Sequence, residues 1–175
     1  ILNEIINKSI IDVNSDVVWF FNGEERKVHS LKELNQLLSH VCDTIYYKTP
    51  IIRNELFNRQ KISSAISLAR VNLLDAMLNN NEEIDFGFPE NSFPPEKTIY
   101  YTLLKESGIH RQSADGTWIL TEPNTDNLRP LWDVCQQFLS GCTDKPKKLS
   151  ELVKILTAQP YKVKDGLLEF WLPTY

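Results

Sequence analysis

The sequence predicts an α+β fold that is mainly α: a helical domain with small β-hairpins and winged-helix-like pieces. Most apolar residues recur at helical spacing over long stretches, whereas the strand-like runs are short and lie in pairs around Asn22-Gly23 and Asp115-Gly116. The chain has 175 residues, of which 42% are apolar and 24% charged. This composition supplies a core without help from a metal or from disulfides.

The first hairpin is expected between residues 17–21 and 26–29. The run 17–21 is β-branched and aromatic, and Asn-Gly is the dipeptide most favoured in a two-residue hairpin turn. Ser30 and Glu33 have the spacing of a capping box, in which each side chain binds the other residue's backbone N–H. Leucine, valine and isoleucine then recur at helical spacing, which predicts a helix over 31–45.

A short helical turn is predicted after Pro50, and a long helix that ends near Asn80 is predicted to follow it. Its buried stripe is expected to consist of Ile62, Ala65, Ile66, Ala69, Leu73, Ala76 and Met77. Residues 82–94 are rich in proline and acidic side chains, so they are expected to form a loop between two parts of the chain.

The C-terminal part is predicted to contain a helix, a hairpin and three further helices. Pro95 suits the first turn of a helix and Gly108 suits its end. Residues 109–112 and 117–120 are expected to pair as the second hairpin. Helices are then expected over the ranges 128–139 and 149–156 and from Asp165 onward.

These patterns divide the chain into an N-terminal segment with a hairpin, a helical subdomain and a winged-helix-like subdomain. The three parts are residues 1–29, 30–81 and 95–175, with 82–94 as the linker loop. The first residue is Ile1 and the last stretch is apolar, so we expect a fragment of a longer protein. The three cysteines are widely spaced, which favours reduced thiols and a cytoplasmic location. No signal peptide or membrane segment is expected.

Patterns that indicate catalysis are absent from the sequence. No glycine-rich turn precedes a lysine and a serine or threonine, so no phosphate-binding loop is expected. The three histidines are scattered, and the acidic residues between Glu82 and Glu96 lack the spacing of a calcium loop. We therefore expect no catalytic residue, no metal and no cofactor in this chain. Trp118 on the second hairpin is the aromatic side chain most suited to a contact role.

Basic residues form two clusters although the net charge is -4. Candidate contacts to nucleic acid or phosphate in these clusters are Arg53, Arg59, Lys61, Arg70, Lys147, Lys148, Lys154, Lys162 and Lys164. A local basic surface attracts phosphate even on an acidic protein. The alternative is that these side chains form a solvated helix face or pair with the acidic loop, and the net charge favours this interpretation.

Three stretches resemble the central region of large bacterial ATP-binding proteins of phage-defence and DNA-modification gene clusters, including the BREX-type ATPases. They are residues 49–59, 94–100 and 160–167, and the resemblance covers most of the chain from Ser30 onward. In such proteins a P-loop ATPase module precedes a long helical region. The resemblance therefore implies an accessory domain that contacts other domains of the same chain or protein partners.

Arg53 has two interpretations. In the first, Asn54 and Glu55 cap the adjoining helices and Arg53 pairs with an acid; in the second, Arg53 and Arg59 face a phosphate on DNA or on a nucleotide. The sequence thus predicts a non-catalytic accessory or interaction domain without contact to a membrane. The alternative is a winged-helix-like nucleic-acid-binding module that contacts DNA through residues 145–164 and Trp118, and an unrecognised hydrolase is the least favoured function.

Overall fold

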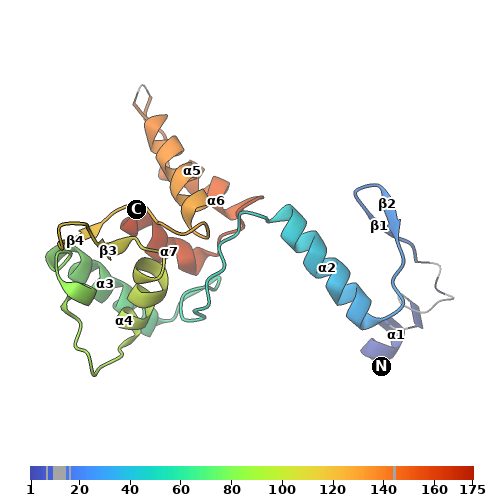
Figure 1. The fold of residues 1–175 in the computed structure, drawn as a ribbon. Helices are drawn as coiled ribbons and strands as arrows, with labels where there is room; N and C mark the ends of the chain where they lie inside the picture. Colours follow the sequence, from blue (N-terminus) through green and yellow to red (C-terminus); the bar gives the residue numbers. More distant parts are fainter. Residues whose placement is uncertain (7, 10–14, 16, 144) are drawn as a thin grey trace. The chain divides into compact units, whose positions relative to one another are not determined.

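A computed structural model of the chain describes residues 1–6, 8, 9, 15, 17–143 and 145–175 (Figure 1). Contacts divide these residues into two units, unit 1 (Ile1–Tyr47) and unit 2 (Lys48–Tyr175). The division falls after Tyr47 and not in the expected linker, because the helices on both sides of the 82–94 loop share one hydrophobic core. The predicted class, α+β and mainly α with small hairpins, is confirmed.

Unit 1 begins with a short helix and a hairpin. Helix α1 spans Leu2–Ile6, and strands β1 (Trp19–Phe21) and β2 (Glu24–Arg26) pair antiparallel. Asn22 and Gly23 both have positive φ angles, 53° and 80°. This is the backbone of a type I′ turn, which the Asn-Gly dipeptide predicted.

Helix α2 of unit 1 spans Leu31–Ile45 and begins at the capping residues that the sequence identified. Ser30 accepts a hydrogen bond from the Glu33 amide at 3.1 Å. The Glu33 carboxylate accepts one from the His29 amide at 2.8 Å, one residue before the expected partner. No residue of α2 is buried, although its apolar side chains lie along one face.

Unit 2 combines helices with one hairpin. Its α-helices are α3 (Ser64–Asn79), α4 (Pro95–Tyr100), α5 (Arg129–Ser140), α6 (Leu149–Thr157) and α7 (Asp165–Thr174). A wider helical turn, η3 (Tyr101–Lys105), continues α4. Strands β3 (His110–Gln112) and β4 (Trp118–Leu120) form the second hairpin. The helices and the hairpin of the predicted winged-helix-like piece are therefore present.

The core of unit 2 is organised around α7, which lies beside α3 (Figure 1). Phe170 and Trp171 are fully buried, and the Phe170 ring packs against Phe57 with centroids 5.2 Å apart. The Trp171 indole N–H donates to Cys135 Sγ of α5 at 3.4 Å, which ties α5 to α7. The predicted stripe of α3 is buried except for Ala65, which is exposed because it lies in the first turn, at the edge of the buried face.

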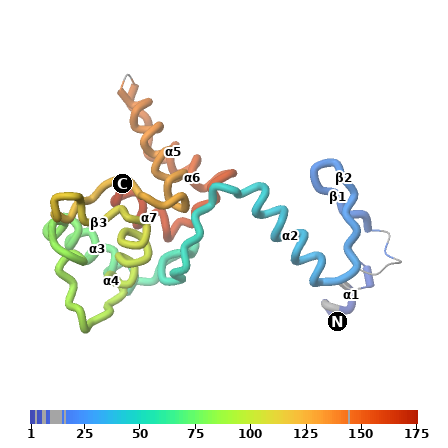
Figure 2. The backbone as a smooth tube through the Cα atoms, viewed as in Figure 1, coloured from blue at the N-terminus to red at the C-terminus, as the bar shows by residue number. Residues whose placement is uncertain are grey.

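The 82–94 loop, traced in Figure 2, is anchored to the core of unit 2. Its left-handed turn, η2 (Ile84–Gly87), places the Phe86 side chain against the Tyr100 ring with centroids 4.7 Å apart. The buried Lys97 amine of α4 donates to the Pro89 carbonyl, and to a second loop carbonyl. An apolar anchor and a buried cation thus hold a segment that its composition predicted as a linker.

Candidate functional site

A cavity of about 310 Å³ in unit 2 contains one of the predicted contact residues, Arg53. Three stretches far apart in the sequence line it: residues 51–53, residues 102–107 at the end of the α4–η3 helix, and residues 125–128 before α5. Its walls are partly apolar, since Ile52 and Leu128 are buried residues of the core. At this volume the cavity lies at the lower end of the range for small-molecule sites, about 300–1,000 Å³.

The backbone that carries Arg53 is anchored on both sides. Before it, the Asn127 side chain binds both peptide groups of Ile51: the Ile51 N–H donates to Oδ1 at 2.7 Å, and Nδ2 donates to the Ile51 carbonyl at 3.0 Å. After it, the buried Asn54 donates to Thr102 Oγ1 at 3.0 Å and accepts from the Leu56 amide at 3.0 Å. The position of the Arg53 Cα is therefore fixed relative to η3.

Most polar groups around the cavity already have partners within the protein. Thr102 donates its hydroxyl to the Thr98 carbonyl at 3.1 Å, and Ser107 donates to the Leu103 carbonyl at 2.6 Å. Both the oxygen and the nitrogen of the Asn127 side-chain amide bind the backbone of Ile51. These groups build the wall and are not available to a ligand.

Three lining side chains have no hydrogen-bond or ion-pair partner among the described residues: Arg53, Glu106 and Thr125. Arg53 pairs neither with Glu55 nor with an acid of the 82–94 loop, whereas the neighbouring Asn54 binds the Leu56 amide as a capping residue would. A guanidinium presents a planar fork of N–H donors that matches a carboxylate or a phosphate. The cavity thus offers one cation, one anion and one hydroxyl to a ligand.

The other basic residues of the first predicted cluster do not join Arg53. The Arg59 guanidinium donates from Nε to the Glu55 carbonyl at 2.5 Å, and Arg70 forms an ion pair with Glu169 of α7. Lys61 is exposed. None of these three side chains lines the cavity.

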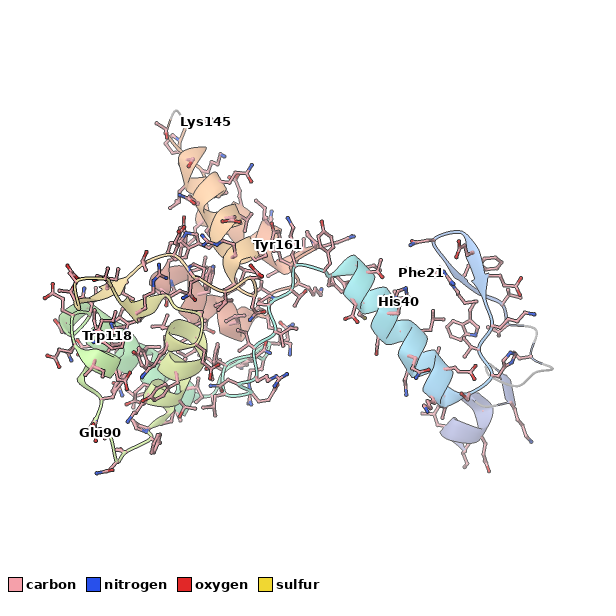
Figure 3. All side chains as sticks on the ribbon, in the orientation of Figure 1. Phe21, His40, Glu90, Trp118, Lys145 and Tyr161 are labelled. Carbon is pink, nitrogen blue, oxygen red and sulfur yellow. The ribbon has the colours of Figure 1, made fainter. Side chains whose placement is uncertain are left out.

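The residues of the second predicted cluster lie in three places in unit 2. Lys147 and Lys148 are exposed in the connection between α5 and α6, where Lys145 also lies (Figure 3). The Lys147 amine lies 5.2 Å from the centroid of the Phe138 ring. Lys164 donates to the Asn58 carbonyl at 3.0 Å, so its amine serves the structure. Lys154 and Lys162 are exposed on α6 and on the turn before α7.

A second polar constellation, the His110 network, was missed by the sequence reasoning. It consists of Asp85 in the left-handed turn, Tyr100, Tyr101 and Lys105 on the α4–η3 helix, and His110 on β3. His110 is 1% exposed, and its Nε2 lies 2.9 Å from the carbonyl oxygen of Asn81. Because that oxygen only accepts, Nε2 carries the hydrogen, and Nδ1 accepts from the Tyr100 hydroxyl at 2.7 Å.

Asp85 closes this network from the loop side. Its carboxylate accepts from Lys105 Nζ at 2.5 Å and from the Tyr101 hydroxyl at 2.7 Å. Burial acts to raise the pKa of Asp85, but these donors outweigh it, so the pKa lies below its usual value. Asp85 and Phe86 both have φ angles of 52°, which a residue with a Cβ adopts only when its surroundings impose it.

Burial also determines the charge of the histidine. Desolvation lowers the pKa of His110 and outweighs the attraction of Asp85, so the ring is neutral at neutral pH. Trp118 covers the ring, with centroids 4.9 Å apart. The tryptophan predicted as a contact residue therefore packs against His110 of the network.

No group of three or more histidine, cysteine, aspartate or glutamate side chains suited to a metal ion occurs in the described part of the chain. The same residues include no helix that is both long enough and apolar enough to cross a bilayer. No protein-family model, curated protein or solved structure matches the chain.

Proposed function

We propose that the chain is a non-catalytic interaction module that binds an oxyanion-bearing ligand or partner group in the Arg53 cavity. The observation that carries this proposal is a guanidinium without an ion-pair partner in the described part of the chain, on a backbone that is hydrogen-bonded on both sides. Because the backbone that carries the arginine is held in place before binding, only the side chain has to become ordered when the anion arrives. An accessory role of this kind is also what the resemblance to ATP-binding defence proteins implies.

The chemistry of the cavity favours binding over turnover. The hydroxyls of Thr102 and Ser107 donate to backbone carbonyls, so neither is free to act as a nucleophile beside the carboxylate of Glu106. The buried Tyr100 and His110 contact one another, but neither lines this cavity. The function that we assign to these residues is to hold an anion.

A titration followed by NMR tests the proposal. Sodium propionate, a minimal carboxylate, should shift the amide resonances of residues 51–53 and 125–128 in a saturable manner. Arg53→Gln should weaken this binding about tenfold, the effect of losing a charge-assisted hydrogen bond. Arg59→Gln is the matched control, because Arg59 is exposed and outside the cavity. Equal binding by the Arg53 and Arg59 variants would refute the proposal.

A second candidate function, nucleic-acid binding, is favoured by the exposed lysines at 145, 147 and 148 between α5 and α6. Phosphate contacts of this kind weaken steeply as salt rises. Duplex binding that disappears on charge reversal at Lys147, Lys148 and Lys154, but persists in Lys32→Glu, would support it. Absence of duplex binding at low salt would exclude it.

A further inference from the structure

The geometry points to a zwitterion, an α-amino acid with an apolar side chain, as the ligand of the Arg53 cavity. This inference rests on the proposed function and adds the chemical class of the ligand. It follows from the second charge in the lining, the carboxylate of Glu106.

Arg53 and Glu106 are present in one cavity without neutralising one another. No nitrogen of Arg53 lies within 4.0 Å of an oxygen of Glu106, and neither side chain has another ion-pair partner among the described residues. The two charges belong to separate elements, the anchored segment after Pro50 and the end of the α4–η3 helix. A ligand that bears a carboxylate and an ammonium group satisfies both.

The carboxylate at Glu106 discriminates against other oxyanions. A phosphate monoester carries close to two negative charges at neutral pH, so Glu106 repels it while Arg53 attracts it. An amino acid replaces this repulsion with an attraction to its ammonium group. Electrostatic complementarity of this kind determines specificity more than affinity.

The remaining lining agrees with a small, partly apolar ligand. The cavity of about 310 Å³ is small for a nucleotide, and Ile52 and Leu128 provide apolar wall. The hydroxyl of Thr125, which has no partner within the described ranges of the chain, is a further donor or acceptor for the carboxylate or the ammonium group.

Three related probes separate the contributions of the two charges: L-leucine, N-acetyl-L-leucine, which lacks the ammonium group, and L-leucinamide, which lacks the carboxylate. With the full chain, leucine should bind about tenfold more tightly than either derivative, because each has lost one charge-assisted contact. Inorganic phosphate should bind more weakly than leucine.

Glu106→Gln provides the decisive variant. It should weaken leucine binding about tenfold and leave N-acetyl-leucine binding unchanged or stronger, because the repelling charge is removed. Glu106 is exposed, so the variant should fold, and Arg59→Gln again serves as the control.

The outcomes distinguish this inference from the proposed function. If N-acetyl-leucine binds as tightly as leucine, or phosphate binds more tightly, and Arg53→Gln abolishes that binding, the zwitterion is wrong and oxyanion binding at Arg53 stands. If none of the probes shifts the cavity resonances, both are refuted. The inference holds only if Glu106→Gln weakens the binding of ligands that carry the ammonium group and of no others.

Discussion

The α4–η3 helix contributes to two polar sites of opposite character. Tyr101 and Lys105 belong to the His110 network, whereas Thr102 and Glu106, each one residue further along, line the Arg53 cavity. In the network the buried polar groups bond to one another. In the cavity a cation and an anion have no partner among the described residues. The difference supports our proposal that the cavity binds a ligand, whereas the mutually bonded groups of the network stabilise unit 2.

Removal of the histidine ring should have the largest effect on stability. His110→Ala leaves a cavity beside Phe86 and Trp118 and removes the nearer acceptor of the Tyr100 hydroxyl, which keeps Asp85 Oδ1 at 3.2 Å. We expect a loss of about 3–4 kcal/mol in the free energy of unfolding, measured with urea. The exposed His29→Ala should change it by less than about 0.5 kcal/mol. A similar small change for both variants would mean that the network has no structural role.

Removal of a single hydroxyl should cost more stability in the buried part of the network, at Tyr100, than in its half-buried part, at Tyr101. Tyr100→Phe leaves Nδ1 of His110 without a donor, which should cost about 1–3 kcal/mol in the free energy of unfolding. Tyr101→Phe should cost less, about 0.5–1.5 kcal/mol, because Asp85 keeps its bond to Lys105. Urea unfolding of both variants tests this order, and the reverse order would contradict our assignment of the Tyr100 hydrogen bond.

The neutral histidine should make unit 2 sensitive to mild acid. Burial places the pKa of His110 below its usual 6.5, so the unfolded chain takes up a proton first as the pH falls. Stability that is present above pH 6.5 is therefore lost below it, with a slope of at most about 1.4 kcal/mol per pH unit. Asp85 has a pKa below its usual 3.8, so the stability that it contributes is lost only as the pH falls below 3.8. This pH range is separate from that of His110.

Urea unfolding between pH 8 and 5 measures this effect, with His110→Ala as the comparison. The unmodified chain should lose stability over that range, and the variant should lose less. Equal losses in the two proteins would assign the pH dependence to other groups.

The smallest change in stability is expected at the cavity. Arg53→Gln and Glu106→Gln each remove an exposed charge with no ion-pair partner among the described residues. We expect both to change the free energy of unfolding by less than about 0.5 kcal/mol, although Arg53→Gln abolishes most of the ligand affinity. A loss above about 2 kcal/mol would show that these side chains support the fold.

Some elements could be predicted because their signals are local. The Asn22-Gly23 turn needs only two residues that tolerate positive φ, and Ser30 caps α2 through an amide three residues away. The periodicity of α3 identified its buried face apart from Ala65. Short-range geometry and side-chain spacing sufficed in each case.

Other features were hidden because their partners are distant in the sequence. Asp85 is one acid among several in a proline-rich loop, and only folding places it beside Lys105. The position of His110 in the sequence does not indicate its role, since the Asn81 carbonyl that binds it belongs to another segment. Arg53 was identified as a candidate, but the Glu106 that shares its cavity was not.

The sequence by itself determined the α-helices from α2 onward, the two hairpins and the side chains able to form a core, because backbone propensity and periodicity act over a few residues. The tertiary structure decided which charges are satisfied. Arg70 pairs with Glu169 and Lys164 binds the Asn58 carbonyl, whereas Arg53, at a cavity lined by three distant stretches, has no partner among the residues that the structure describes. Whether a charged side chain stabilises the fold or remains available to a ligand depends on its neighbours in space, which its neighbours in the chain do not specify.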